Sequence, residues 1–277
     1  MSSRNWIANL IPDFIVGLLR HKDGGEFIYR HQLWRGIMAY GWLSKFFLVI
    51  SILVGLKFLS FFRSWFSDFH AENIQVVGAQ MMNLFEGLYH EGESLFLMGG
   101  TKYVILVLTE VMVFHFVRKT AEILTGKAED SSFQAFVRAQ IRMIKVSFAS
   151  YGLELAATIV LGILIKIVGF DFLKEPLTFF IQCFFLGFVI ADNYLERSDV
   201  PITEALKICR SVAGVVIAVG LVTYILLLVP IVGAIIAPMV AGVVVTLLFF
   251  EYEIKGIIEI PDPKTDPQDQ LDEVPAT

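Results

Sequence analysis

The sequence contains a run of forty consecutive residues, 211–250, without a charged side chain. One helix crosses the hydrocarbon of a bilayer with about 20 apolar residues, so this run is about twice the length of a single crossing. Pro230 and Pro238 lie in its middle, and a proline removes a helix donor and clashes with the preceding turn. We therefore expect two apolar arms that fold back on each other in lipid. The second arm, 239–250, is short for a complete crossing, so a partly inserted hairpin and two full spans both stay open.

The composition supports this class. Of the 277 residues, 56% are hydrophobic and only 18% are charged, with a mean hydropathy of +0.69, which is typical of an all-α integral membrane protein. A net charge of -5 offers no basic field for nucleic acid. We expect one membrane domain, 1–260, followed by a disordered acidic tail, 261–277, that is rich in proline.

Three further segments precede the hairpins. Residues 5–20 have helical apolar spacing, are interrupted by Pro12 and are too short to span, so they predict an amphipathic helix in the membrane interface, ended by the polar stretch 21–32. Long transmembrane helices are predicted at about 33–66 and 99–125. An acidic connector with its own amphipathic pattern lies between the two long helices.

Two Pro/Gly-broken helical hairpins are predicted at about 132–195 and 203–254. Each has a basic amphipathic lead-in, an apolar arm, an Ile-Val-Gly sequence, a proline several residues later, and a second arm that ends at an acidic residue. The shared order suggests two copies of one unit, and for each of them partial and full insertion into the membrane both stay open. A serine before the first hairpin, Ser131, is a plausible helix cap.

The placement of lysine and arginine predicts the orientation, because cytoplasmic loops retain positive charge. Basic residues gather before the first long helix and after the second, whereas the connector between them carries them only at its edges. We expect both termini in the cytoplasm.

Glu110 and His115 lie inside the second long helix, whereas its end, with Arg118, should project into water. Glu110 and His115 would be costly in lipid, so they should face protein or a wet cavity, and with Arg118 they form a candidate polar network or part of a pathway. A helix-packing hydrogen bond is the alternative role. On an anion pathway, Glu110 should be neutral or paired with a base.

The order of parts resembles the CysZ-type sulfate permeases and their etoposide-induced relatives. The local likenesses are residues 122–126 (Glu-Ile-Leu-Thr-Gly), 191–194 (Ala-Asp-Asn-Tyr), 228–233 (Leu-Val-Pro-Ile-Val-Gly) and 237–238 (Ala-Pro), and the resemblance extends over about residues 30–255. The resemblance implies two long transmembrane helices with two hairpins, assembly into homo-oligomers, and conduction of sulfate.

In that family an arginine pair before the first long helix binds sulfate. Arg35 matches the second arginine, Trp34 stands in place of the first, and Gly36 follows. Arg30, on the same segment, could assist, and backbone N–H groups at a helix start can hold an anion together with one guanidinium. A positive-inside anchor is the alternative role for Arg35.

No catalytic or phosphate-binding motif is present, and the histidines and cysteines show no metal-ligand spacing, so we expect neither an enzyme nor a cofactor. Two functions stay open. The first is an oxyanion permease or channel in the lipid bilayer. The second is a membrane scaffold of the same fold that does not transport.

Overall fold

The computed structural model describes residues 6–35, 49, 101–227, 229 and 232–260, and their regular structure is helical throughout. The predicted helix 33–66 beyond its start, the acidic connector, Pro230 and the tail 261–277 lie outside the described residues. The helices are α1 (Trp6–His31), α4 (Thr101–Leu108), α5 (Glu110–Thr125), α6 (Phe133–Val168), α7 (Lys174–Glu196), α8 (Ile202–Ser211), α9 (Ala213–Leu227) and α10 (Val232–Ile254).

Three of these helices, α6, α7 and α10, are long and apolar enough to cross a membrane. The pair α8 and α9 passes the same criterion only as a bent unit, with an angle of 98° between the two helices. The described residues therefore have the character of a helical membrane protein.

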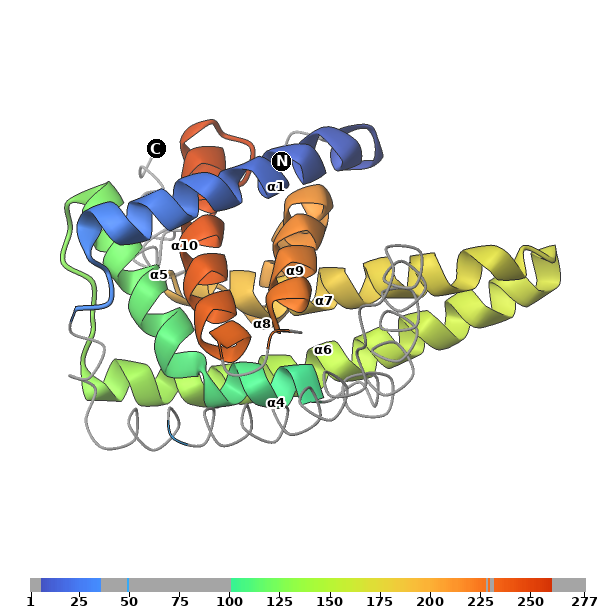
Figure 1. Ribbon diagram of the computed structural model, residues 1–277, viewed down its shortest axis with the longest axis horizontal. Coiled ribbons are helices and arrows are strands. Elements are labelled where there is room, and N and C mark those ends of the chain that lie inside the picture. The colour runs from blue at the N-terminus through green and yellow to red at the C-terminus, as the bar shows by residue number, and fades with distance from the viewer. Residues whose placement is uncertain (1–5, 36–48, 50–100, 228, 230–231, 261–277) are drawn as a thin grey trace, which may run out of the picture.

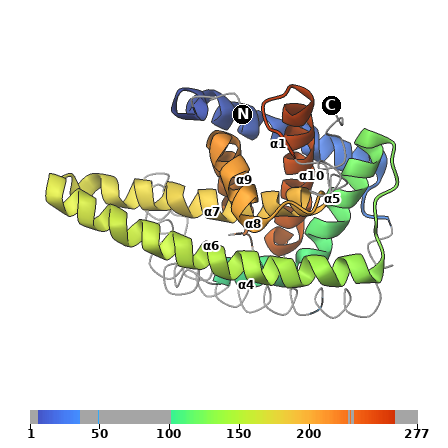
Figure 2. The same ribbon diagram turned by 180° about the vertical axis from the view of Figure 1, so that it is seen from behind.

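Helices α9 and α10 stand side by side, with α1 lying across one pair of their ends and α4 near the other (Figure 1). Helices α6 and α7 run across them and extend well beyond the rest of the molecule, as the reverse view also shows (Figure 2). The chain reverses between α6 and α7 at Gly169, which has φ 80° and donates its N–H to the carbonyl of Ile165. Ser132, rather than the predicted Ser131, caps α6 by accepting the N–H of Ala135.

Glycines allow α7 and α9 to lie in close contact. A Cβ atom on Gly187 would lie 2.0 Å from the carbonyl oxygen of Val216, and one on Gly220 would lie 1.8 Å from that of Cys183. Only residues without a side chain let the two backbones approach this far, as at small-residue contacts in membrane proteins.

Two predictions for the N-terminal helix are wrong: the residue at which it ends, and the placement of its apolar residues on one face. Helix α1 continues to His31, through Pro12 and through the polar stretch that was expected to break it. Gly24 does not end the helix because it fits against Val244 of α10, where a Cβ would lie 2.5 Å from a Val244 methyl. The apolar residues expected on one face are divided between a half-buried face and an exposed stripe: Leu10, Phe14 and Leu18 are half-buried, and Trp6, Ile7, Ile11 and Leu19 are exposed.

Two other predictions need correction. The stretch 99–125 is not one continuous helix, because α4 ends at Leu108 and α5 begins at Glu110. Thr109 lies at the break, with its hydroxyl donated to the carbonyl of Ile105. In the second hairpin, Pro238 lies inside α10 and does not end it, so the second arm has 23 residues and is not short.

Candidate functional site

A network of ion pairs joins α5, the loop after it, and the end of α7. Arg118 donates to Glu196 at 2.8 Å and to Glu129 at 3.4 Å. Glu129 also accepts from Arg197 at 2.5 Å. All four side chains are largely shielded from solvent. The loop carboxylate Glu129 is thus held between two guanidinium groups.

A second ion pair lies beside this network. The guanidinium of Arg142, on α6, donates to both carboxylate oxygens of Asp192, on α7, at 2.7 and 2.8 Å. A bidentate pair of this kind is both strong and directional. We call these residues, together with Glu110 and Asn193, the α5–α7 charge cluster: Glu110, Arg118, Glu129, Arg142, Asp192, Asn193, Glu196 and Arg197.

Glu110 is the carboxyl group of the α5–α7 charge cluster that has no basic side chain as a partner among the described residues. Its side chain is fully buried, and Oε2 accepts a 3.5 Å hydrogen bond from Asn193. Among the described residues, Oε1 has no hydrogen-bond partner and no basic group forms an ion pair with the carboxyl. Burying an unpaired carboxylate costs far more than burying the acid, so the geometry favours the neutral form.

His115 connects α5 to the turn after α1. Its Nε2 lies 2.7 Å from the carbonyl oxygen of Leu33, a geometry in which Nε2 carries the proton and donates. Leu33 is buried, whereas Trp34 and Arg35 are exposed. The N–H groups of Leu33 and Arg35 are donated to the carbonyls of Ile28 and Gln32, so neither of these two N–H groups is available to an anion. Gly36 lies outside the described residues.

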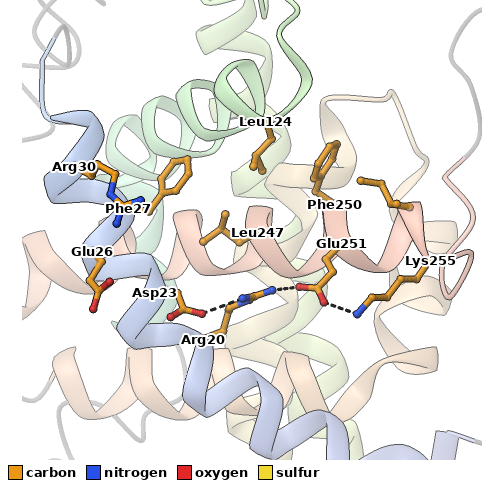
Figure 3. A pocket seen from close by; sticks show the side chains of 11 residues that line it. Arg20, Asp23, Glu26, Phe27, Arg30, Leu124, Leu247, Phe250, Glu251 and Lys255 are labelled. Atoms are coloured by element: carbon orange, nitrogen blue, oxygen red, sulfur yellow. Dashed lines mark hydrogen bonds and ion pairs between the residues drawn. The ribbon is translucent and has the colours of Figure 1, made fainter.

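Arg30 lines a groove of about 510 Å³ between α1, α5 and α10 (Figure 3). We call it the α1–α10 groove. Its lining is Arg20, Asp23, Glu26, Phe27, Arg30, Leu124, Leu247, Phe250, Glu251, Ile254 and Lys255. The predicted site residues are therefore divided: Glu110 and Arg118 share the charge cluster, Arg30 lines the groove, and Trp34 and Arg35 occupy the turn after α1.

The sequence analysis missed a second buried charge pair. Lys102 on α4 and Glu154 on α6 lie 2.7 Å apart, with side-chain exposures of 1% and 6%. The hydroxyl of Tyr103 donates to the other oxygen of Glu154 at 2.5 Å. Glu154 is the one charged residue between Lys145 and Lys166, and that isolation in an apolar helix was a usable signal.

Within the described ranges, no group of histidine, cysteine or acidic side chains could hold a metal ion. No protein family, curated protein or solved structure matches the chain. The class of the protein therefore comes from its helices: the regular structure of the described residues is all helical, and three of these helices are long and apolar enough to span a membrane.

Proposed function

We propose that the chain is an integral membrane permease or channel for a small oxyanion such as sulfate. The observation that carries the proposal is the position of α5. Through His115 this helix holds the turn that bears Arg35, and through Glu110 and Arg118 it enters the α5–α7 charge cluster. Ionisable groups within membrane-spanning helices commonly mark substrate or ion pathways.

The charge balance of the cluster fits an anion path. Three carboxylates, Glu129, Asp192 and Glu196, each have an arginine partner. With Glu110 neutral, the cluster has no net negative charge to repel an anion. Arg35 would attract the anion at the surface, and the arginines would then offer exchangeable guanidinium donors along the path.

The alternative function is a membrane scaffold that does not transport. The observation in its favour is the projecting end of the α6–α7 hairpin, where the large apolar side chains of Ile167 and Phe172 are 76% and 74% exposed. Such a surface acts on lipid or a partner without needing a path for ions. In both proposals the protein is not an enzyme, has both termini in the cytoplasm, lies in a bacterial inner membrane and forms homo-oligomers.

Radiolabelled sulfate uptake into proteoliposomes containing the full chain tests the transport proposal. We expect uptake well above that of empty liposomes, and a loss of about tenfold in Arg35→Ala, because one charged contact is worth roughly 1.5–3 kcal/mol. Arg138→Ala is the matched control, since its exposed guanidinium pairs with Asp130 outside the charge cluster.

Uptake equal to that of empty liposomes, with the folded protein present, would exclude transport of sulfate and favour the scaffold. Normal uptake by Arg35→Ala would remove Arg35 from the site but leave the permease proposal standing.

A further inference from the structure

The α1–α10 groove lies at the end of α10 where the chain returns to water. Glu251 is the first charged residue after the forty uncharged ones, and it lines the groove with Lys255. Charged side chains that bound an apolar helix sit at the membrane–water interface. The groove therefore lies at the depth of lipid headgroups.

The lining of the groove is amphipathic. Phe27, Leu247 and Phe250 supply apolar surface from α1 and α10, and Phe27 and Leu247 pack against the buried residues Leu33 and Phe116. Charged side chains stand around this floor (Figure 3). A ligand that fills the groove must present both an apolar part and a charged part.

Four of the six charged residues already satisfy one another. Arg20 pairs with Asp23 and with Glu251, and Glu251 also accepts from Lys255, so these side chains form one chain across the groove (Figure 3). Among the described residues, Glu26 and Arg30 form no ion pair, although they are four residues apart on α1, where such a pair commonly forms. One negative and one positive charge are thus left for a ligand.

We propose that the α1–α10 groove binds a zwitterionic phospholipid, with its phosphate at Arg30, its ammonium at Glu26, and the start of its acyl chains on Phe27 and Leu247. The charge complementarity selects this occupant, because a free oxyanion or an anionic lipid would pair with Arg30 and leave Glu26 unmatched. A volume of about 510 Å³ is within the range of small-ligand sites. The proposal is independent of sulfate transport and depends only on the chain lying in a membrane.

Binding to the full chain in detergent tests the proposal, with native mass spectrometry as the readout. The probes are dihexanoyl phosphatidylethanolamine, dihexanoyl phosphatidylglycerol and inorganic phosphate. We expect the wild type to prefer the ethanolamine lipid about tenfold. Arg30→Gln should weaken both lipids, and Glu26→Gln should weaken the ethanolamine lipid alone and remove the preference. Lys22→Gln, an exposed change on α1 outside the groove, should leave both affinities unchanged.

Glu26→Gln distinguishes the proposed lipid site from a simple oxyanion site, because the two predict opposite changes in the binding of the ethanolamine lipid. If the groove is an oxyanion site, removing a carboxylate strengthens the binding of every probe that carries a phosphate, the ethanolamine lipid included, and stronger binding of the ethanolamine lipid would overturn the proposal. Equal affinity for the two lipids in the wild type would do the same. Both side chains are exposed, so the variants should fold, and thermal melting verifies this. Sulfate uptake is measured separately, so failure here leaves the proposed function untouched.

Discussion

The two helical hairpins share an order of sequence features but differ in their surroundings. In the most apolar stretch of α6, 11% of the residues are buried, against 67% in α10. Helices α1, α5, α7 and α9 surround α10, whereas α6 extends with α7 beyond the rest of the molecule (Figures 1 and 2). The contrast lies in one helix, because α7 of the first hairpin is as buried as α10, at 67%, and α6 alone leaves most of its apolar residues exposed.

The Ile-Val-Gly sequences show the same contrast. In the first hairpin Gly169 has φ 80° and ends α6, a left-handed conformation that glycine adopts at low cost. In the second, Gly233 lies within α10, where a Cβ would be 1.8 Å from the carbonyl oxygen of Leu226. One glycine is required for its backbone angle, and the other for close contact between helices.

The largest effect should come from glycines at the crossing of α7 and α9. We expect Gly220→Ala to prevent folding, because the new Cβ would meet backbone that cannot move without separating the helices. Gly152→Ala, in the exposed part of α6, is the control: a Cβ there meets nothing within 4 Å. Replacing a glycine in a helix interior by alanine should stabilise that helix by about 0.5–1 kcal/mol. The measurement is the yield of monodisperse protein in detergent. Equal yields of the two variants would contradict the difference in packing.

The second effect concerns the charge pair that fastens α4 to the exposed hairpin. Lys102→Met leaves Glu154 buried with only the Tyr103 hydroxyl, and should cost about 3–5 kcal/mol. The double variant Lys102→Met/Glu154→Leu should recover most of that loss, because an apolar pair needs no charge compensation. Thermal unfolding in detergent measures both. A double variant less stable than Lys102→Met would show that the pair has a role beyond compensating its own burial.

These two predictions depend on contacts between helices that the sequence alone does not reveal. The helical class, the apolar arms and the reversal at Gly169 follow from composition and periodicity, which are local properties. The continuation of α1 through Gly24 does not, because it depends on Val244, more than two hundred residues away. The same holds for Lys102, whose partner Glu154 is identified only once α4 lies against α6.

The candidate site divides in the same way. Burial of Glu110 could be predicted from its cost in lipid, whereas Arg118 was expected to project into water and is buried instead. Their partners could not, since Asn193 and Glu196 read in sequence as the polar end of an apolar arm. Pro238 was misread for a related reason: a proline inside a helix is tolerated when neighbouring helices surround it, and α10 is surrounded.

The third effect concerns the tips of the two hairpins. Charged residues flank the α6–α7 tip, at Lys166 and Lys174, whereas the α9–α10 tip lies inside the uncharged run. We expect the first tip to reach water and the second to stay in hydrocarbon. In membranes, Ile167→Cys should therefore react several-fold more with a membrane-impermeant maleimide than Val229→Cys, although both side chains are exposed on the protein. The native cysteines, Cys183 and Cys209, are buried and give a low background. Stronger labelling at position 229 would reverse this assignment.

The smallest effect should come from His21, on the helix that covers the second hairpin but not the first. Burial lowers the pKa of His21, and its Nδ1 lies 2.8 Å from the carbonyl oxygen of Gly17, which a neutral ring can reach by donating. The folded protein therefore binds this proton less readily than the unfolded chain. The stabilisation is complete above the ordinary pKa of about 6.5 and falls as the pH drops towards the lowered value. From pH 7.5 to 5.5, thermal unfolding should show a loss below about 1 kcal/mol that His21→Gln removes. His31→Gln, an exposed change at the end of α1, should leave the loss in place. An identical pH dependence in His21→Gln would mean that the seating of α1 on α9 and α10 does not depend on this ring.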